Sequence, residues 1–230
     1  MKKIRLHCET IYFIAILMLS FSVAMITTAS FGVSMLVAPA YNLSQKVTFL
    51  TLGQCEYIIQ GLLFFVLCII MKKVKIIYFS SFLTCILYGA LLDLWRVIIP
   101  VFNPAITPQG SMSMPIRIIF FAIGMLLTAL SVALFYRTYL YPQVYDFFVK
   151  SISAKFGIDR TKLKRIFDAG CLLVACTMTL IFFQRFIGVG IVTLIMTIFN
   201  GILIGFVGRQ LDEHFEFTPY FKKLAGYFEL

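Results

Sequence analysis

The sequence predicts an all-α polytopic membrane protein with about six transmembrane helices in two inverted three-helix repeats. Its composition, its long apolar runs and the distribution of its basic residues lead to this prediction. Of the 230 residues, 61% are hydrophobic and 13% are charged, whereas soluble domains are roughly 45–50% apolar and about 25% charged. So few charges cannot cover a water-facing surface, so residues 1–230 are expected to form a single domain in lipid.

Six apolar runs are long enough to cross a bilayer, which requires about 20 residues. They cover residues 10–31, 54–71, 76–99, 116–136, 166–184 and 187–208. Each run is apolar on every side, as a helix surrounded by lipid should be. The first run is longer than the apolar part of a signal peptide, about 7–15 residues, so it is expected to remain as a span. The last two runs are separated only by Gln184–Phe186, which predicts a tight helical hairpin.

The basic residues predict the orientation of these spans. If the N-terminus is inside, 16 of the 20 Lys and Arg residues lie on the cytoplasmic side, including the run Lys72, Lys73 and Lys75. This asymmetry follows the positive-inside rule and places both termini in the cytoplasm. The net charge of +10 could suggest nucleic acid. The charges are scattered over short loops, however, which favours contact with lipid head groups instead.

The chain divides into residues 1–100 and 115–230, joined by an outer linker over 101–114. Each half contains one span, a polar connector and two further spans. Because three spans per half is an odd number, the second half must be inverted relative to the first. Such inverted repeats are a recurrent architecture of transporters, with the substrate site near the bilayer midplane between the halves.

The connectors contain further elements. Residues 145–158 have apolar side chains at a spacing of four, which predicts an amphipathic helix on the inner membrane surface. These side chains are Phe148, Ile152 and Phe156. A similar short helix is expected after Pro219, with Phe221, Leu224 and Phe228 on its lipid side. The segment 33–52 is compatible with either a surface helix or a re-entrant segment.

Ionisable and amide side chains are costly inside a membrane, so each is a functional candidate. The candidates for binding a substrate or an ion are Glu56, Gln60, Asp93, Arg96, Asp168 and Asn200. Structural alternatives exist for most of them. Glu56 and Asp168 could stabilise helix N-termini, Asp93 and Arg96 could form an ion pair, and Asn200 could bond to another helix.

Several glycines lie in the same apolar sequence as these candidates. The spacing of Gly201 and Gly205 is typical of a close helix contact.

Enzyme chemistry finds little support, and no catalytic residue is assigned. The only histidines are His7 and His214, both near a terminus, and no hydrolase, metalloprotease or nucleotide-binding motif occurs. The six cysteines show no metal-binding spacing and are expected to act as small buried hydrophobic residues. The sequence therefore predicts a protein that is not an enzyme and has neither a metal site nor a cofactor.

Three stretches resemble the YczE/YyaS/YitT group of bacterial multipass membrane proteins. They are Thr27–Ser44 (TTASFGVSMLVAPAYNLS), Tyr88–Arg96 (YGALLDLWR) and Gly188–Asp212 (GVGIVTLIMTIFNGILIGFVGRQLD). The chain departs from the pattern at Ile191, where threonine is expected. The resemblance implies a small protein of the bacterial inner membrane, and it carries over no functional residue because that group has no agreed activity.

The leading functional hypothesis is a small secondary transporter or exporter of a small solute. Glu56 and Asp168 would bind a cation or a proton, and Asp93 with Arg96 would gate the outer mouth. The alternatives are a substrate-binding membrane subunit of a partner-driven transporter and a non-transporting scaffold or accessory protein. The expected partners are the lipid bilayer, a small-molecule substrate and a second copy or another membrane protein, but no nucleic acid. Substrate, coupling ion and direction of movement stay open.

Overall fold

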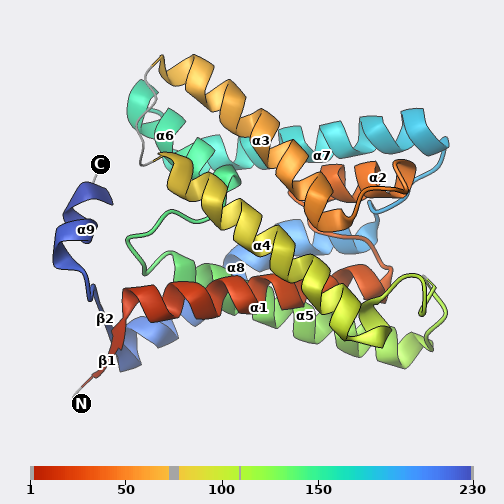
Figure 1. Cartoon of the computed structure of the whole chain (residues 1–230), viewed down its shortest axis with the longest axis horizontal. Helices are drawn as coiled ribbons and strands as arrows, with labels where there is room; N and C mark the ends of the chain where they lie inside the picture. The colour runs from red at the N-terminus through yellow and green to blue at the C-terminus, as the bar shows by residue number, and fades with distance from the viewer. Residues whose placement is uncertain (1–2, 73–77, 109, 229–230) are drawn as a thin grey trace.

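The computed structural model describes residues 3–72, 78–108 and 110–228 of the chain (Figure 1). Among these residues, six helices are long and apolar enough to cross a membrane. They are α1 (Cys8–Ala29), α3 (Leu52–Met71), α4 (Phe79–Ile98), α5 (Met114–Phe135), α7 (Arg160–Phe183) and α8 (Ile191–His214). Each overlaps one of the predicted runs, so the prediction of a helical protein with six candidate spans is confirmed.

Both termini lie at the same end of the bundle, which we call the terminal end, and the opposite end is the far end (Figure 1). Helices α1, α4 and α7 run from the terminal end to the far end, and α3, α5 and α8 run back. At the far end, α4 is followed by the short helix η2 (Pro100–Phe102) and the linker to α5.

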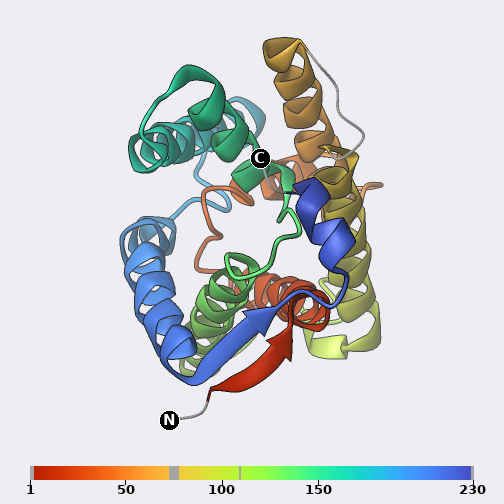
Figure 2. The same ribbon diagram turned by 90° about the vertical axis from the view of Figure 1, so that its left-hand side faces the viewer.

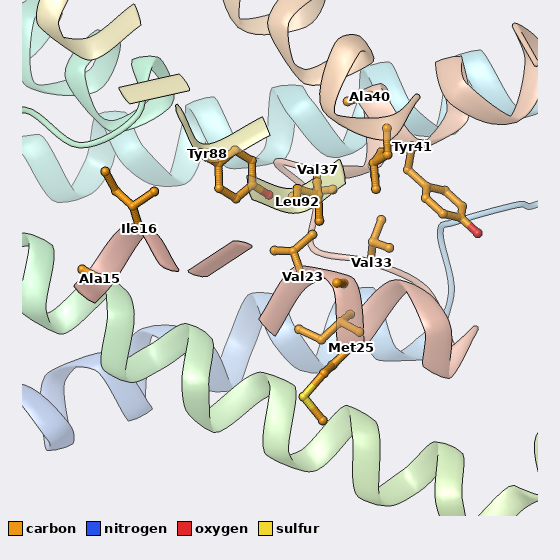
Figure 3. Packing of buried hydrophobic residues seen from close by; sticks show 14 of the residues in the cluster. Ala15, Ile16, Val23, Met25, Val33, Val37, Ala40, Tyr41, Tyr88 and Leu92 are labelled. Carbon is orange, nitrogen blue, oxygen red and sulfur yellow. The ribbon is translucent and has the colours of Figure 1, made fainter. Parts of the chain in front are cut away.

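Helix α1 is the most buried of the six candidate spans and packs on both α4 and α5. Of its most apolar stretch 61% is buried, against 11% for α7 and 17% for α8, so α7 and α8 lie at the periphery. Gly124 of α5 allows that helix to lie close against α1, because a Cβ there would lie 2.7 Å from the Ile26 side chain. Figure 3 shows Val23 of α1 converging with Tyr88 and Leu92 of α4 in the core.

The first connector contains α2 (Ala38–Lys46), which lies between α3 and α7. The preceding stretch turns back from the far end into the bundle, and Ser34 and Val37 line the same cavity as Val23 of α1. Residues 37–42 are buried, so this part of the connector lies inside the protein, as the re-entrant alternative for residues 33–52 requires. Such buried backbone is tolerated in a membrane only within protein or beside a cavity.

The second connector contains α6 (Val144–Phe156), the helix predicted over 145–158. Like α2, it lies between α3 and α7. Phe147 and Ile152 are buried among side chains of α3 and α4, and only Phe156 of the predicted apolar face is exposed. The interfacial position predicted for this helix is therefore not confirmed.

The termini form a small parallel sheet that the sequence did not predict. Strand β1 (Ile4–His7) pairs with β2 (Phe215–Thr218), in the register that places Arg5 opposite Glu216 (Figure 2). The side chains of these two residues form an ion pair at 3.2 Å. The short helix α9 (Lys222–Phe228) follows, in agreement with the predicted C-terminal helix. Of the side chains predicted for its lipid face, Phe221 is exposed, whereas Leu224 and Phe228 lie outside the described part, as do Lys73 and Lys75.

The tight hairpin predicted for the last two spans is wrong. Helix α7 ends at Phe183 and α8 begins at Ile191, and over the described residues the two helices make almost no contact with each other. The loop between them is instead fixed to the first half of the chain. The backbone N–H of Val33 donates to the carbonyl of Gly188 at 2.9 Å, so the loop anchors α8 away from α7.

Otherwise the helices of the two halves pack in matching pairs. Helix α1 packs on α4 as α5 packs on α8, and α1 and α5 pack extensively on each other. Likewise, the connector helix of each half packs on both α3 and α7: α2 in the first half and α6 in the second. The main departure concerns the last two spans of each half. Helix α3 packs closely on α4, but α7 and α8 are apart over the described residues.

Candidate functional site

A cavity of about 920 Å³ lies where α7 and α8 diverge. Its walls come from α1, α4, α5, α6, α7 and α8 and from the stretch before α2, so it lies between the two halves of the chain. Pockets of this size hold one drug-sized molecule. Two of the predicted site residues, Asp168 and Asn200, line this cavity.

Glycines occur both where α3 contacts α4, the closed helix pair, and where α7 and α8 are apart, the open pair. A Cβ added at Gly53 of α3 would overlap the carbonyl oxygen of Gly89 of α4, so these two helices cross in contact. A Cβ added at Gly201 or Gly205 of α8 would meet nothing within 4 Å. Both α8 glycines line the cavity instead of making the helix contact that their spacing predicts.

A buried polar cluster lies behind the wall of the cavity. Glu56 and Gln60 of α3 are both fully buried, and the Gln60 Nε2 donates to Glu56 Oε2 at 2.9 Å. Gln60 Oε1 accepts from the backbone N–H of Val144 at 3.1 Å and thereby holds the first residue of α6. Tyr145 donates its hydroxyl to Glu56 Oε2 at 3.1 Å. Because Tyr145 also lines the cavity, a single side chain separates Glu56 from it.

Glu56 is a buried carboxyl group that lacks a cation. Over the described residues no Lys, Arg or His side chain forms an ion pair with it, and its Oε1 has no hydrogen-bond partner. Burial raises the pKa of the Tyr145 phenol well above its usual value, so this hydroxyl stays protonated and remains a donor. An uncompensated carboxylate is costly to bury, so Glu56 is suited to take up a proton or a small cation.

Asp168 has a different environment from Glu56. The ammonium group of Lys164 lies 3.1 Å from Asp168 and 3.2 Å from Asp146 of α6, so one lysine bridges two carboxylates. This triad ties α6 to α7 beside the cavity. The sequence proposes a similar role for Glu56 and Asp168, but the structure does not bring the two carboxyl groups together.

Asp93 and Arg96 lie on α4 near the far end and do not form an ion pair with each other. Asp93 instead accepts from the Thr51 hydroxyl at 2.5 Å and from the backbone N–H of Gly53 at 3.0 Å. Its carboxylate therefore binds the N-terminus of α3 and holds that helix against α4. The Arg96 Nε is buried without a hydrogen-bond partner.

Residues 6–209 match DUF6198, a family of unknown function. The chain belongs to the DUF6198 family. No curated protein and no solved structure matches the chain.

Several residues of the candidate site in this DUF6198 protein were not singled out from the sequence. Gln143 and Tyr145 come from the second connector, whose polar character hides their position against α3. Arg137, which follows α5, donates to both carboxylate oxygens of Asp212, at 2.7 and 2.5 Å. Lys164 was also not singled out. Its spacing of four residues from the candidate Asp168 is the one sequence signal that could have suggested it.

The polar cluster yields a prediction for the stability of the DUF6198 protein. Gln60→Leu should lower the free energy of unfolding by about 1–3 kcal/mol, because it leaves the buried Val144 N–H without an acceptor and removes one of the two donors to Glu56 Oε2. Glu56→Gln preserves the shape and removes an uncompensated carboxyl group, so its stability should be equal to that of the parent or higher. Thermal unfolding in detergent measures both variants. A larger loss for Glu56→Gln than for Gln60→Leu would contradict this interpretation of the cluster.

Proposed function

We propose that this DUF6198 protein is a small secondary transporter that works by alternating access between two inverted three-helix halves. The supporting observation is the matched packing of the halves together with its one departure, the closed pair α3–α4 and the open pair α7–α8. Transporters built from inverted repeats expose their site alternately to the two sides as one repeat rocks against the other. When the halves exchange conformations, α7 closes on α8 and α3 separates from α4.

Asp93 is suited to hold the closed pair together at the far end. Its bonds to Thr51 and to the backbone of Gly53 cross from α4 to α3, so they must break when these helices separate. This supports the gate proposed for Asp93. For Arg96, the only observation relevant to a gating role is that its buried Nε has no hydrogen-bond partner.

Glu56 is the better candidate for coupling transport to a proton or a cation. It lacks a counter-ion in this conformation, and Tyr145 connects it to the cavity wall. Asp168 is already balanced by Lys164, so the triad is better suited to hold α6 against α7 than to bind a free cation.

The location follows from the same proposal. We place the protein in a bacterial inner membrane, with the terminal end of the bundle in the cytoplasm, because most basic residues belong to that end. The resemblance to the YczE/YyaS/YitT group agrees with this location. The cavity and the lack of a counter-ion at Glu56 among the described residues favour transport over catalysis and over a dry scaffold.

Labelling of an engineered cysteine tests this proposal. In a variant whose six cysteines are replaced by alanine, Gly201→Cys should react with a membrane-impermeant maleimide added from either side of vesicles. Ile202→Cys is the control, because Ile202 is 63% exposed on the outer surface of α8 and should react poorly from both sides. Reaction of Gly201→Cys from neither side would indicate a scaffold, and reaction from one side only would indicate a binding subunit. Either result would overturn alternating access.

A further inference from the structure

The cavity is electrically balanced although it is lined by charged groups. Three cationic and three anionic side chains line it: Arg137, Lys164, Arg209, Asp146, Asp168 and Asp212. A molecule with a net charge gains no net attraction from such a set, since its charge meets equal numbers of both signs. An uncharged or zwitterionic molecule therefore fits the cavity better than an anion or a cation.

The two signs are not spread evenly over the walls. On the α6–α7 wall, Lys164 serves both Asp146 and Asp168, which leaves one negative charge in excess. On the α5–α8 wall, Arg137 pairs with Asp212 at 2.5 Å, and Arg209 forms no ion pair with any described residue. This wall therefore carries one positive charge in excess. Among the residues that line the cavity, the two walls thus carry opposite unit charges, an arrangement complementary to a zwitterion.

The same opening gives access from the bilayer. Helices α7 and α8 are apart over the described residues, and the α8 surface between them carries Gly201 and Gly205 in place of side chains. The outer faces of the two helices are apolar, with Leu173 and Ile202 exposed by 69% and 63%. A molecule dissolved in the membrane can therefore approach the cavity sideways, between the apolar outer faces of α7 and α8.

Deeper in, the walls suit the body of an amphiphile. Val23 and Met196 are apolar and buried, and the lack of side chains at the α8 glycines leaves room for a chain. Asn200 lines the same part, and its Oδ1 has no hydrogen-bond partner. It offers an acceptor for a hydroxyl group between the head and the chain.

We infer that the cavity binds a zwitterionic single-chain amphiphile, such as one with a phosphocholine head group, which enters from the bilayer between α7 and α8. The cationic part of the head lies toward Asp168, the anionic part toward Arg209, and the chain along the α8 glycines. The inference rests on the proposed transport function, for which it names the class of substrate.

Photolabelling tests this inference. The full chain is reconstituted in vesicles of an uncharged glycolipid, so that the bilayer supplies no competing zwitterion. Three amphiphiles share one diazirine-bearing chain and differ in their heads, which are phosphocholine, phosphate or trimethylammonium. The phosphocholine probe should label the cavity side of α8, around Thr197 and Ile204, about tenfold more than the other two probes. Excess unlabelled phosphocholine amphiphile should remove this labelling.

Variants make the test specific to the site. Gly201→Leu fills the cavity and should lower the labelling about tenfold, whereas the control Ile202→Leu on the lipid side should leave it unchanged. Asp168→Asn should let the phosphate probe label as well as phosphocholine, and Arg209→Gln should do the same for trimethylammonium. Equal labelling by all three heads would overturn the inference, as would labelling confined to the lipid face around Ile198 and Ile202. Two-sided maleimide labelling at Gly201→Cys alongside such a result would leave transport standing and reject only this substrate class.

Discussion

Replacing Gly89 by leucine should destabilise the protein, whereas the same replacement at Gly201 should not. A side chain at Gly89 meets the Tyr57 ring and lies 2.9 Å from the carbonyl oxygen of Gly53, so α3 and α4 must move apart. Overpacking of this kind costs about 1–3 kcal/mol, and more where backbone blocks the new atoms. At Gly201 nothing lies within 4 Å, and leucine gains up to about 1 kcal/mol in helix propensity over glycine.

Thermal unfolding of the two variants in detergent measures this difference. Because Gly89 lies on α4 and Gly201 on α8, the last span of each half, each variant is the matched control of the other. A melting temperature that falls for Gly89→Leu and stays constant or rises for Gly201→Leu is the expected result. If Gly201→Leu lost as much stability as Gly89→Leu, α7 and α8 would have to be packed together in solution, and the cavity would not exist.

The positions of the spans were predictable because each is decided by local composition. A run of about 20 apolar residues has few alternatives to a membrane helix. The ends were less certain where a helix continues beyond its apolar run. Helix α7 begins at Arg160, six residues before the predicted span, because charged residues form its first turns and Asp159 caps them by accepting from the backbone N–H of Lys162.

The features that the sequence did not predict depend on contacts between distant segments. The pairing of β1 with β2 joins the two ends of the chain, and no local pattern distinguishes these short strands from helix ends. The loop between α7 and α8 is likewise bonded to a distant segment, through the hydrogen bond between Val33 and Gly188. A short connector between two apolar runs favours a hairpin, and only the position of the first half of the chain changes that outcome.

The candidate site was predicted in part for the same reason. Glu56 and Gln60 are four residues apart on one helix, so their contact follows from helix geometry and is present in the structure. Their partners Gln143 and Tyr145 lie more than eighty positions away. Asp93 was predicted as a candidate because it is an ionisable residue in an apolar run. Its hydrogen bond to the start of α3 could not be predicted, because it depends on how the helices pack.

Alternating access also predicts that the two helix pairs move in opposite directions. Spin labels at Thr161→Cys and Gln210→Cys report the separation of α7 from α8 at the terminal end. Labels at Phe49→Cys and Val97→Cys, both on exposed positions, report the separation of α3 from α4 at the far end. Both pairs are introduced into protein whose native cysteines are replaced by alanine and measured by double electron–electron resonance in vesicles.

Each pair should give two distance populations, one short and one long. Gly201→Leu holds α7 and α8 apart, so it should remove the short α7–α8 population and, with it, the long α3–α4 population. Such a coupled loss is the result expected of two halves that exchange conformations. A single narrow distance for both pairs, unchanged by Gly201→Leu, would show a static bundle and contradict alternating access.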